Sequence, residues 1–172
     1  MNKNLQTFPI LISERLTLRK LSKKDSEEIL QLRSSTEINK YLERKLSTTV
    51  EDALNFIKSI NENEGEELFY WAITKTGEDK LIGTICLFNF VDDLKKCEIG
   101  YELLTEYHGY GIMFEAAKKV IEYAAKILEL KTIDAIPHKE NQSSTKLLEK
   151  LNFKSQDVVG HNPNLILFRL VI

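Results

Sequence analysis

The sequence predicts a single domain, residues 1–172, of the α/β (α+β) class, with a mixed, mostly antiparallel central sheet of six to seven strands flanked by helices. Three observations predict this class. Short segments alternate apolar and polar residues as half-buried strands do, longer segments repeat apolar residues at helical spacing, and the order changes from consecutive strands to strands that alternate with helices. With 172 residues, 42% of them hydrophobic, the chain can bury one core.

The N-terminal part predicts one strand and two helices. Residues Arg15–Leu21 alternate apolar and polar side chains, which predicts a half-buried strand. Ser22–Asp25 supplies residues that favour a helix start, and Thr48 or Thr49 can cap a second helix. The apolar residues of that second helix recur at three-residue spacing, at Leu54, Ile57 and Ile60.

Strands predominate in the middle of the chain and alternate with helices after it. Three strands joined by polar turns predict an antiparallel meander: Leu68–Thr74, Leu81–Phe90 and Lys95–Leu104. The remaining elements are a helix over Gly109–Glu129, a strand over Lys131–Ile136, a helix over Asn141–Leu151, and strands over Phe153–Val159 and Leu165–Ile172. Such an order places a ligand crevice where one connection leaves the sheet.

Charge and composition exclude several classes of partner. The 24 Lys and Arg residues against 26 Asp and Glu residues give a net charge of −2, too little positive charge for a nucleic-acid-binding protein. The early apolar stretch Phe8–Ile12 is far shorter than the ~20 residues that span a bilayer, so we expect a cytoplasmic protein with no membrane partner. Cys86, Cys97 and the three histidines lack the spacing of metal ligands, so no metal is expected.

The junction between the third meander strand and the following helix carries the strongest chemical signal. Gly109 and Gly111 leave the backbone N–H groups of the first helical turn uncovered. These donors and the positive end of the helix dipole form an anion site that suits a diphosphate. The alternative is that the two glycines only permit a tight turn.

A second segment, Glu140–Phe153, joins an asparagine to a helix with a leucine face. Together with the segment from Glu98 to Met113, it resembles the two acyl-CoA-binding motifs of the Gcn5-related N-acetyltransferase (GNAT) superfamily. Ser13–Arg19, Leu81–Ile85 and Leu148–Phe153 are similar to the branch typified by the ribosomal-protein N-terminal acetyltransferases. The resemblance implies the acyl-CoA N-acyltransferase fold over the whole chain and acetyl-CoA as cosubstrate.

The resemblance also implies which residues bind the cosubstrate. The main chain of Glu102, Leu103 and Leu104 would pair with the pantetheine arm as an added strand does, and Asn141 would contact the arm from the other side. The pyrophosphate would be held by the amides of the loop and first helical turn: His108, Gly109, Tyr110, Gly111, Ile112 and Met113. Ser144 would lie beside the arm, one helical turn after Asn141.

Two catalytic roles follow from the resemblance. The position of the usual proton-donating tyrosine holds Leu148, so Ser144 is the expected donor to the leaving thiolate. Its alternative is an ordinary helix-start hydroxyl that bonds the backbone. Glu98 is the expected general base, directly or through a water molecule, and Glu102 is the second candidate.

Three positions differ from the superfamily pattern. Glu106 and His108 stand where many members have Gln or Arg, and Met113 replaces a small residue. The first two changes remove a cationic donor near the phosphates, which predicts weaker binding of CoA.

The expected function is the transfer of an acetyl group from acetyl-CoA to a primary amine by direct attack on the thioester. A protein or peptide N-terminal α-amine suits a weak base best, because at pH 7 deprotonation costs about 1 kcal/mol for an α-amine and about 4.6 kcal/mol for a lysine. The alternatives are a small-molecule amine, such as a polyamine or an antibiotic, and a CoA-binding regulatory module with little turnover. A homodimer is a possible state, since dimers are frequent in the branch.

Overall fold

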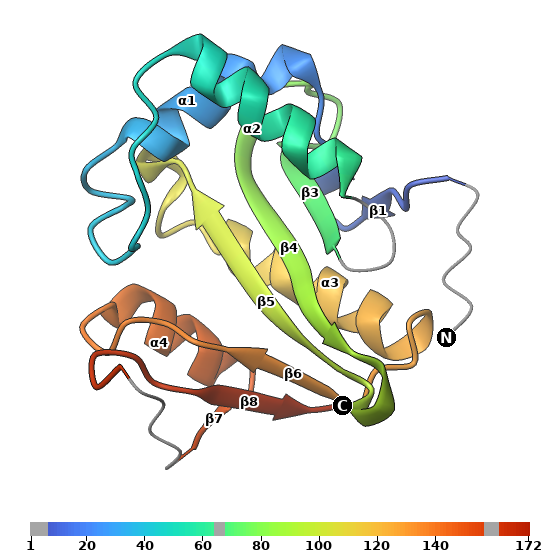
Figure 1. The fold of residues 1–172 in the computed structure, drawn as a ribbon. Helices are drawn as coiled ribbons and strands as arrows, with labels where there is room; N and C mark the ends of the chain where they lie inside the picture. Colours follow the sequence, from blue (N-terminus) through green and yellow to red (C-terminus); the bar gives the residue numbers. More distant parts are fainter. Residues whose placement is uncertain (1–6, 64–67, 157–161) are drawn as a thin grey trace.

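The computed structural model describes residues 7–63, 68–156 and 162–172, which form one open sheet with helices on both faces (Figure 1). The eight strands lie in the order β1-β2-β3-β4-β5-β6-β8-β7. Their bounds are β1 Leu11–Ile12, β2 Leu16–Lys20, β3 Leu68–Lys75, β4 Leu81–Val91, β5 Lys96–Leu103, β6 Thr132–Ala135, β7 Lys154–Ser155 and β8 Phe168–Val171. The helices are α1 Ser26–Ser34, α2 Val50–Glu62, α3 Ile112–Lys126 and α4 Gln142–Lys150, with short 3₁₀ turns at Lys23–Asp25, Asp92–Leu94 and Thr105–Tyr107.

The mixed, mostly antiparallel sheet and the β3–β4–β5 meander are confirmed, but the sheet has eight strands and not six to seven. The additional strand is β1, which pairs with β2 through only two residues and is too short to show alternation in sequence. The predicted strand Phe153–Val159 is described only at its start, where β7 covers Lys154–Ser155, and residues 157–159 lie outside the described residues.

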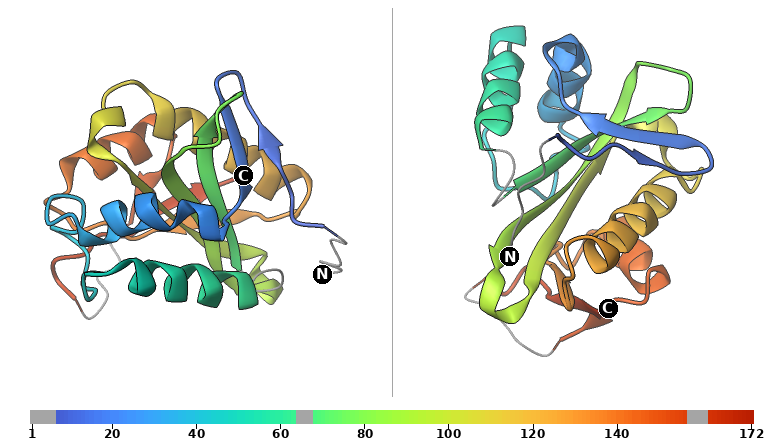
Figure 2. Two further views of the ribbon diagram at one scale, coloured as in Figure 1. Left: turned by 90° about the horizontal axis from the view of Figure 1, so that it is seen from above. Right: turned by 90° about the vertical axis from the view of Figure 1, so that its right-hand side faces the viewer.

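Each face of the sheet has its own apolar core. Helices α1 and α2 cover one face, and α3 and α4 cover the other, as the right-hand view of Figure 2 shows. Trp71 on β3 is fully buried on the α3 face, where its ring stacks on Phe69 at 5.7 Å and meets the edge of Tyr123 at 5.8 Å. Burial of such aromatic rings on one strand and one helix fixes α3 against the sheet.

Polar side chains set the starts of the helices. Thr49 accepts a hydrogen bond from the Asp52 N–H at 3.1 Å, and the Asp52 carboxylate accepts from the main chain of Thr48 and Thr49, so the predicted cap of the second helix is a capping box. At α4, the Asn141 side-chain oxygen accepts from the Ser144 N–H at 3.1 Å. Asn141 is therefore the residue before the helix and not part of it.

Over the described ranges 7–63, 68–156 and 162–172, no helix is long and apolar enough to cross a bilayer. In the same residues, no three His, Cys, Asp or Glu side chains gather into a metal-binding group. Cys86 and Cys97 are both unbridged, and burial raises the pKa of the Cys86 thiol to about 12, so this thiol stays protonated at neutral pH.

Candidate functional site

Strands β5 and β6 run parallel and then separate, which opens the sheet at its centre. Their pairing ends at Glu98 and Asp134, β6 ends one residue later, and β5 continues to Leu103. The two strands diverge in a V in Figure 1. Beyond the vertex, one edge of β5 has no strand beside it.

The unpaired edge of β5 exposes alternate main-chain groups. The Leu104 N–H donates to the Ile82 oxygen of β4 at 3.0 Å. Because neighbouring residues in a strand direct their main-chain groups to opposite edges, Ile99, Tyr101 and Leu103 direct theirs into the V. This corrects the expectation for Glu102, whose main-chain groups face β4, and for Leu104, whose N–H bonds to β4 and whose oxygen accepts from the Tyr107 N–H at 3.0 Å. The Leu103 oxygen already accepts a hydrogen bond from Nε2 of His108 at 2.9 Å.

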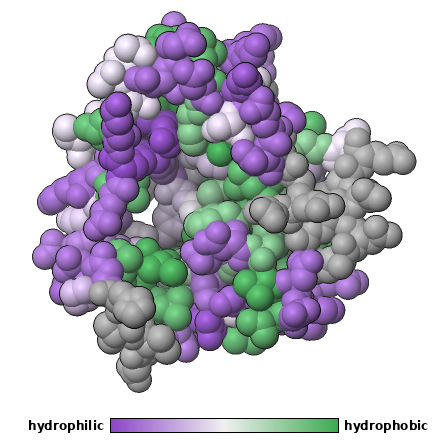
Figure 3. Space-filling model, in the orientation of Figure 1, coloured by the Kyte–Doolittle hydropathy of each residue, from purple (hydrophilic) through white to green (hydrophobic). Residues whose placement is uncertain are grey.

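A cavity of about 150 Å³ lies in the opening of the V. Its lining comes from the loop after α1, from β5, from the β6–α4 connection and from the start of α4: Tyr41, Leu42, Ile99, Gly100, Tyr101, Ala135, Ile136, Pro137, His138, Asn141 and Ser144. Figure 3 shows the molecule hollowed on this side, with hydrophilic residues along the upper rim. The predicted residues Asn141 and Ser144 thus meet β5 across the cavity.

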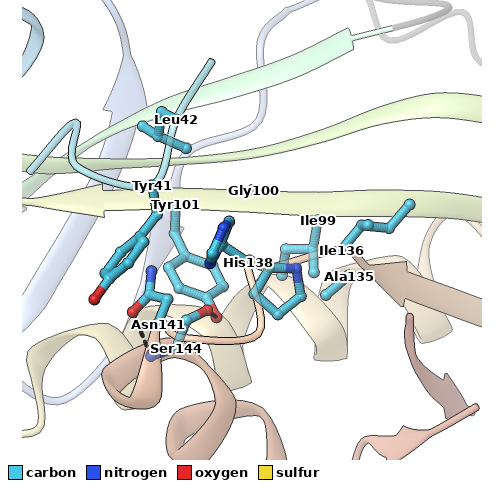
Figure 4. Close-up of a pocket in the computed structure, with 11 residues that line it drawn as sticks. Tyr41, Leu42, Ile99, Gly100, Tyr101, Ala135, Ile136, His138, Asn141 and Ser144 are labelled. Carbon is cyan, nitrogen blue, oxygen red and sulfur yellow. Dashed lines mark hydrogen bonds between the residues drawn. The ribbon is translucent and has the colours of Figure 1, made fainter. Parts of the chain in front are cut away.

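The floor of the cavity carries a pair of hydroxyl groups. Tyr101 reaches from β5 to Ser144 on α4, and their oxygens lie 2.7 Å apart (Figure 4). Burial raises the pKa of Tyr101 to about 12, so its phenol stays protonated at neutral pH. Sequence reasoning left Tyr101 unplaced, although it shares the face of the strand that holds Ile99 and Leu103.

The opposite wall of the cavity is an aromatic pair. The rings of Tyr41 and His138 stack with centroids 5.1 Å apart and an angle of 25° between their planes. Tyr41 belongs to the loop between α1 and α2, and His138 belongs to the connection between β6 and α4. The stack therefore joins the α1–α2 loop to the β6–α4 connection across the mouth of the V (Figure 4).

The loop before α3 presents a run of unsatisfied backbone donors. Gly109 and Gly111 have positive φ angles of 82° and 73°, which glycine adopts without strain. Within the described chain, the N–H groups of Gly109, Tyr110, Gly111, Ile112 and Met113 have no hydrogen-bond partner. The His108 N–H differs, since it donates to the Thr105 oxygen at 3.1 Å. The helix itself begins at Ile112, three residues later than predicted.

A cation from the other end of the sequence lies beside this loop. Arg15, just before β2, donates from Nη1 to the Tyr110 oxygen at 3.0 Å, and its Nη2 lies 3.7 Å from the position that a Cβ on Gly111 would take. Its Nε donates to the Glu115 carboxylate at 2.6 Å, and Ser13 donates to the same group at 2.7 Å. Arg15 therefore supplies the loop with a guanidinium that the positions of Glu106 and His108 lack.

The two glutamates predicted as bases lie on the other face of the sheet from Ser144. The even-numbered residues of β5 face α1 and α2, where Leu104 is buried. Glu98 accepts a hydrogen bond from Nδ2 of Asn89 at 3.1 Å, and Glu102 forms an ion pair with Arg44. Neither carboxylate lines the cavity that holds Ser144.

Comparison with known proteins identifies the family. Residues 15–154 match the model of the acetyltransferase (GNAT) domain. The N-acetyltransferase p20 of Bacillus licheniformis is 37% identical over 152 residues, covering 87% of this chain and 84% of the relative. The N-acetyltransferase YoaA of Bacillus subtilis is 31% identical over 156 residues, covering 88% and 86%. The functions of both relatives are otherwise uncharacterized.

Solved structures of acetyltransferases have the same fold as this chain. A GNAT-family acetyltransferase from Bacillus anthracis aligns with a TM-score of 0.79 and 25% identity, over 95% of this chain and 98% of that one. RimL, a ribosomal L7/L12 α-N-protein acetyltransferase solved in complex with CoA, has a TM-score of 0.80 and 16% identity, over 95% and 98% of the two chains, a likeness that shows the fold alone. The chain belongs to the GNAT acetyltransferase family, and it is an N-acetyltransferase.

Proposed function

We propose that this enzyme transfers acetyl from acetyl-CoA to the N-terminal α-amine of a protein or peptide, with no covalent enzyme intermediate. The observation that carries the proposal is that three features follow one another along β5 and the loop after it. They are the unpaired amides of Gly109–Met113, the edge of β5 that has no strand beside it, and the Tyr101–Ser144 hydroxyl pair.

The residues present fit the cosubstrate. The amides of Gly109–Met113 and the N-terminus of α3 suit a pyrophosphate, and the space beside Gly109 is open, since a Cβ there would meet no atom within 4 Å. The open edge of β5 suits the amides of a pantetheine arm. When bound, acetyl-CoA supplies the thioester that the amine attacks.

Ser144 and Tyr101 control the proton at the leaving sulfur. The two oxygens lie 2.7 Å apart and either hydroxyl can donate to the other. In the proposed arrangement the Tyr101 phenol, which stays protonated at neutral pH, donates to the Ser144 oxygen, and the Ser144 hydroxyl hydrogen is directed to the cavity. That hydrogen can be donated to the departing sulfur, the task of a general acid. Ser144 is thus the proposed catalytic residue, and Tyr101 orients it.

The attacking amine needs less assistance from the enzyme than the leaving sulfur does. Proton removal from an α-amine costs about 1 kcal/mol at pH 7, so the neutral fraction of the amine can react without a strong base in the cavity. Glu98, which faces α1 and α2, could assist only through water molecules that extend round the edge of β5. Support for a protein N-terminus comes from a relative named as a putative ribosomal N-acetyltransferase, YdaF of Bacillus subtilis, which is 26% identical over 182 residues.

An acceptor panel tests the proposal. Thiol release from acetyl-CoA is measured with hexapeptides that have a free N-terminus, with the same peptides blocked at the N-terminus but containing lysine, and with polyamines and aminoglycosides. We expect turnover only with free N-termini, and mass spectrometry should place the acetyl group on the α-amine. Turnover confined to polyamines or aminoglycosides would replace this proposal by small-molecule acetylation.

Arg15 is expected to contribute to CoA affinity. Substitution Arg15→Gln removes the guanidinium beside Gly111 and leaves the ionised Glu115 unpaired near the phosphates, so the Kd for CoA measured by calorimetry should rise about tenfold. The exposed Lys118 on α3 provides a control, since Lys118→Gln removes the same charge away from the loop.

The use of acetyl-pantetheine, which lacks the nucleotide and its phosphates, separates phosphate binding from a general effect on the site. Its KM should be the same in Arg15→Gln and the wild type. An equal loss for acetyl-pantetheine and acetyl-CoA, or an equal effect of Lys118→Gln, would contradict the role given to Arg15.

A further inference from the structure

One ion pair and a second arginine lie close together on the α1/α2 face of β5. Arg33 lies in the last turn of α1, Arg44 lies in the loop that follows, and Glu102 lies on β5. Arg44 forms an ion pair with Glu102 through Nη1, and its Nε donates to the Asn39 side-chain oxygen at 2.6 Å. The cluster therefore contains two positive charges and one negative charge.

Donors in this cluster are left without acceptors. Nε of Arg33 and Nη2 of Arg44 are shielded from solvent and have no hydrogen-bond partner among the residues that the structure describes. Burial lowers the pKa of Arg33, the charge of Arg44 lowers it further, and Glu102 opposes the shift. Because shielded N–H donors of a cation are costly to leave unpaired, the cluster favours an added anion.

The cluster is also held in place before any anion arrives. The Asn39 side chain, which is buried, donates to the Leu32 oxygen at 2.8 Å and to the Ser35 oxygen at 2.7 Å, and this fixes the oxygen that holds Arg44. The Arg33 guanidinium lies over the ring of Phe56 at 4.0 Å. Prearranged guanidinium groups bind carboxylates at a lower cost in conformational entropy than mobile ones do.

The cluster adjoins the cavity through two chain segments. Glu102 follows Tyr101 directly on β5, and Tyr41 and Leu42, which line the cavity, precede Arg44 by three and two residues. One residue of an extended strand spans about 3.3 Å. Because the Glu102 side chain lies on the opposite face of the sheet from Ser144, a peptide whose amine is in the cavity has to pass over the loop of Tyr41 and Leu42 to bring one of its first side chains to the arginines.

We propose that Arg33 and Arg44 form a subsite for a carboxylate that the acceptor carries within its first three residues. This inference rests on the proposed function, because it gives the acceptor peptide an acidic side chain. A single carboxylate matches the single excess positive charge of the cluster, whereas a phosphate dianion would exceed it. Two neighbouring charges of the loop have other partners, since Lys40 lies over the ring of Tyr41 and Glu43 accepts from Asn162.

The test measures binding first and turnover second. Hexapeptides with a free N-terminus and one Glu at position 2, 3 or 4 are compared with their Gln counterparts by calorimetry in the presence of CoA. We expect the Glu peptide to bind about 10- to 100-fold more tightly at position 2 or 3, the range of a charge-assisted hydrogen bond, and the difference to disappear at position 4.

Variants assign the preference to the cluster. In Arg33→Gln the Glu-to-Gln affinity ratio should fall below about threefold, and Arg33→Lys should keep part of it. Comparing two peptides in one preparation cancels any loss of folded protein. Lys45→Gln, which removes an exposed charge of the same loop, is the matched control and should keep the full ratio.

The outcomes separate the inference from the proposed function. Equal affinity for Glu and Gln peptides, no binding of either, or a preference that survives Arg33→Gln would overturn the carboxylate subsite, whatever the turnover. A preference for Glu peptides with no thiol release from any peptide would support the subsite and contradict N-terminal acetylation.

Discussion

Replacement of Ser144 by alanine is expected to lower kcat about 100-fold and to leave the Kd for CoA within about twofold. The substitution removes the hydroxyl that we propose as the donor to the sulfur but none of the amides proposed to hold the pyrophosphate. A positioned general acid contributes roughly 10²- to 10⁴-fold, and a thiolate, which leaves readily, places this enzyme at the low end of that range. The kcat is measured by thiol release in the presence of the acceptor, and the Kd for CoA is measured by calorimetry.

Ser143 provides the matched control, because it is the same residue type on the same helix and its side chain is exposed. Ser143→Ala should change kcat by less than twofold. Tyr101→Phe should lower kcat about tenfold, since it removes the hydrogen bond that orients Ser144 but keeps the ring. An unchanged kcat in Ser144→Ala from pH 6 to 9 would remove Ser144 from the mechanism.

Asp134 is expected to have the largest effect on stability. It lies at the vertex of the V, buried between Arg169 of β8, which donates to it at 2.7 and 2.8 Å, and Lys96 of β5 at 3.3 Å. Asp134→Asn keeps the shape of the side chain but leaves Arg169 and Lys96 without the carboxylate that they pair with. We expect the free energy of unfolding to fall by about 3 kcal/mol, at the lower end for a buried pair because both cations keep contact with water.

The pH dependence gives an independent check. Burial opposes the charge of Asp134, but the hydrogen bonds and charges of Arg169 and Lys96 outweigh it, so the pKa of Asp134 is lowered. The ion group therefore stabilises the fold above the unfolded pKa of about 3.9, and this contribution is lost as pH falls through the lower folded pKa.

Denaturant unfolding between pH 2 and 7 should consequently show that the gap between wild type and Asp134→Asn is constant above pH 5 and closes below pH 4. The exposed Asp93, changed to Asn, should leave the unfolding curve within about 0.5 kcal/mol of the wild type. A gap that stays constant down to pH 2 would mean that packing, and not charge, makes Asp134 important.

Local patterns explain what the sequence predicted. The two glycines at 109 and 111, and the helix cap at Asn141 with Ser144 one turn later, are separated by a few residues, so backbone geometry alone relates them. The meander was predictable for the same reason, because each of its strands follows the previous one across a short turn.

Contacts between distant residues explain what was missed. Tyr101 meets Ser144 across 43 positions, and Arg15 meets Tyr110 across 95. In neither pair does the sequence around one residue indicate that the other residue contacts it. The edge of β5 that faces the V depends on pairing with β4, so the choice between Tyr101 and Glu102 required the observed register.

The opening between β5 and β6 also bears on self-association. Unpaired strand edges on the outside of a sheet invite a strand from another molecule, a common route to aggregation. Here the unpaired groups lie inside a narrow recess between α4 and the loop that holds Tyr41. A neighbouring chain would have to thread into that recess to pair with them, so this edge of β5 is a poor template for a strand of another molecule.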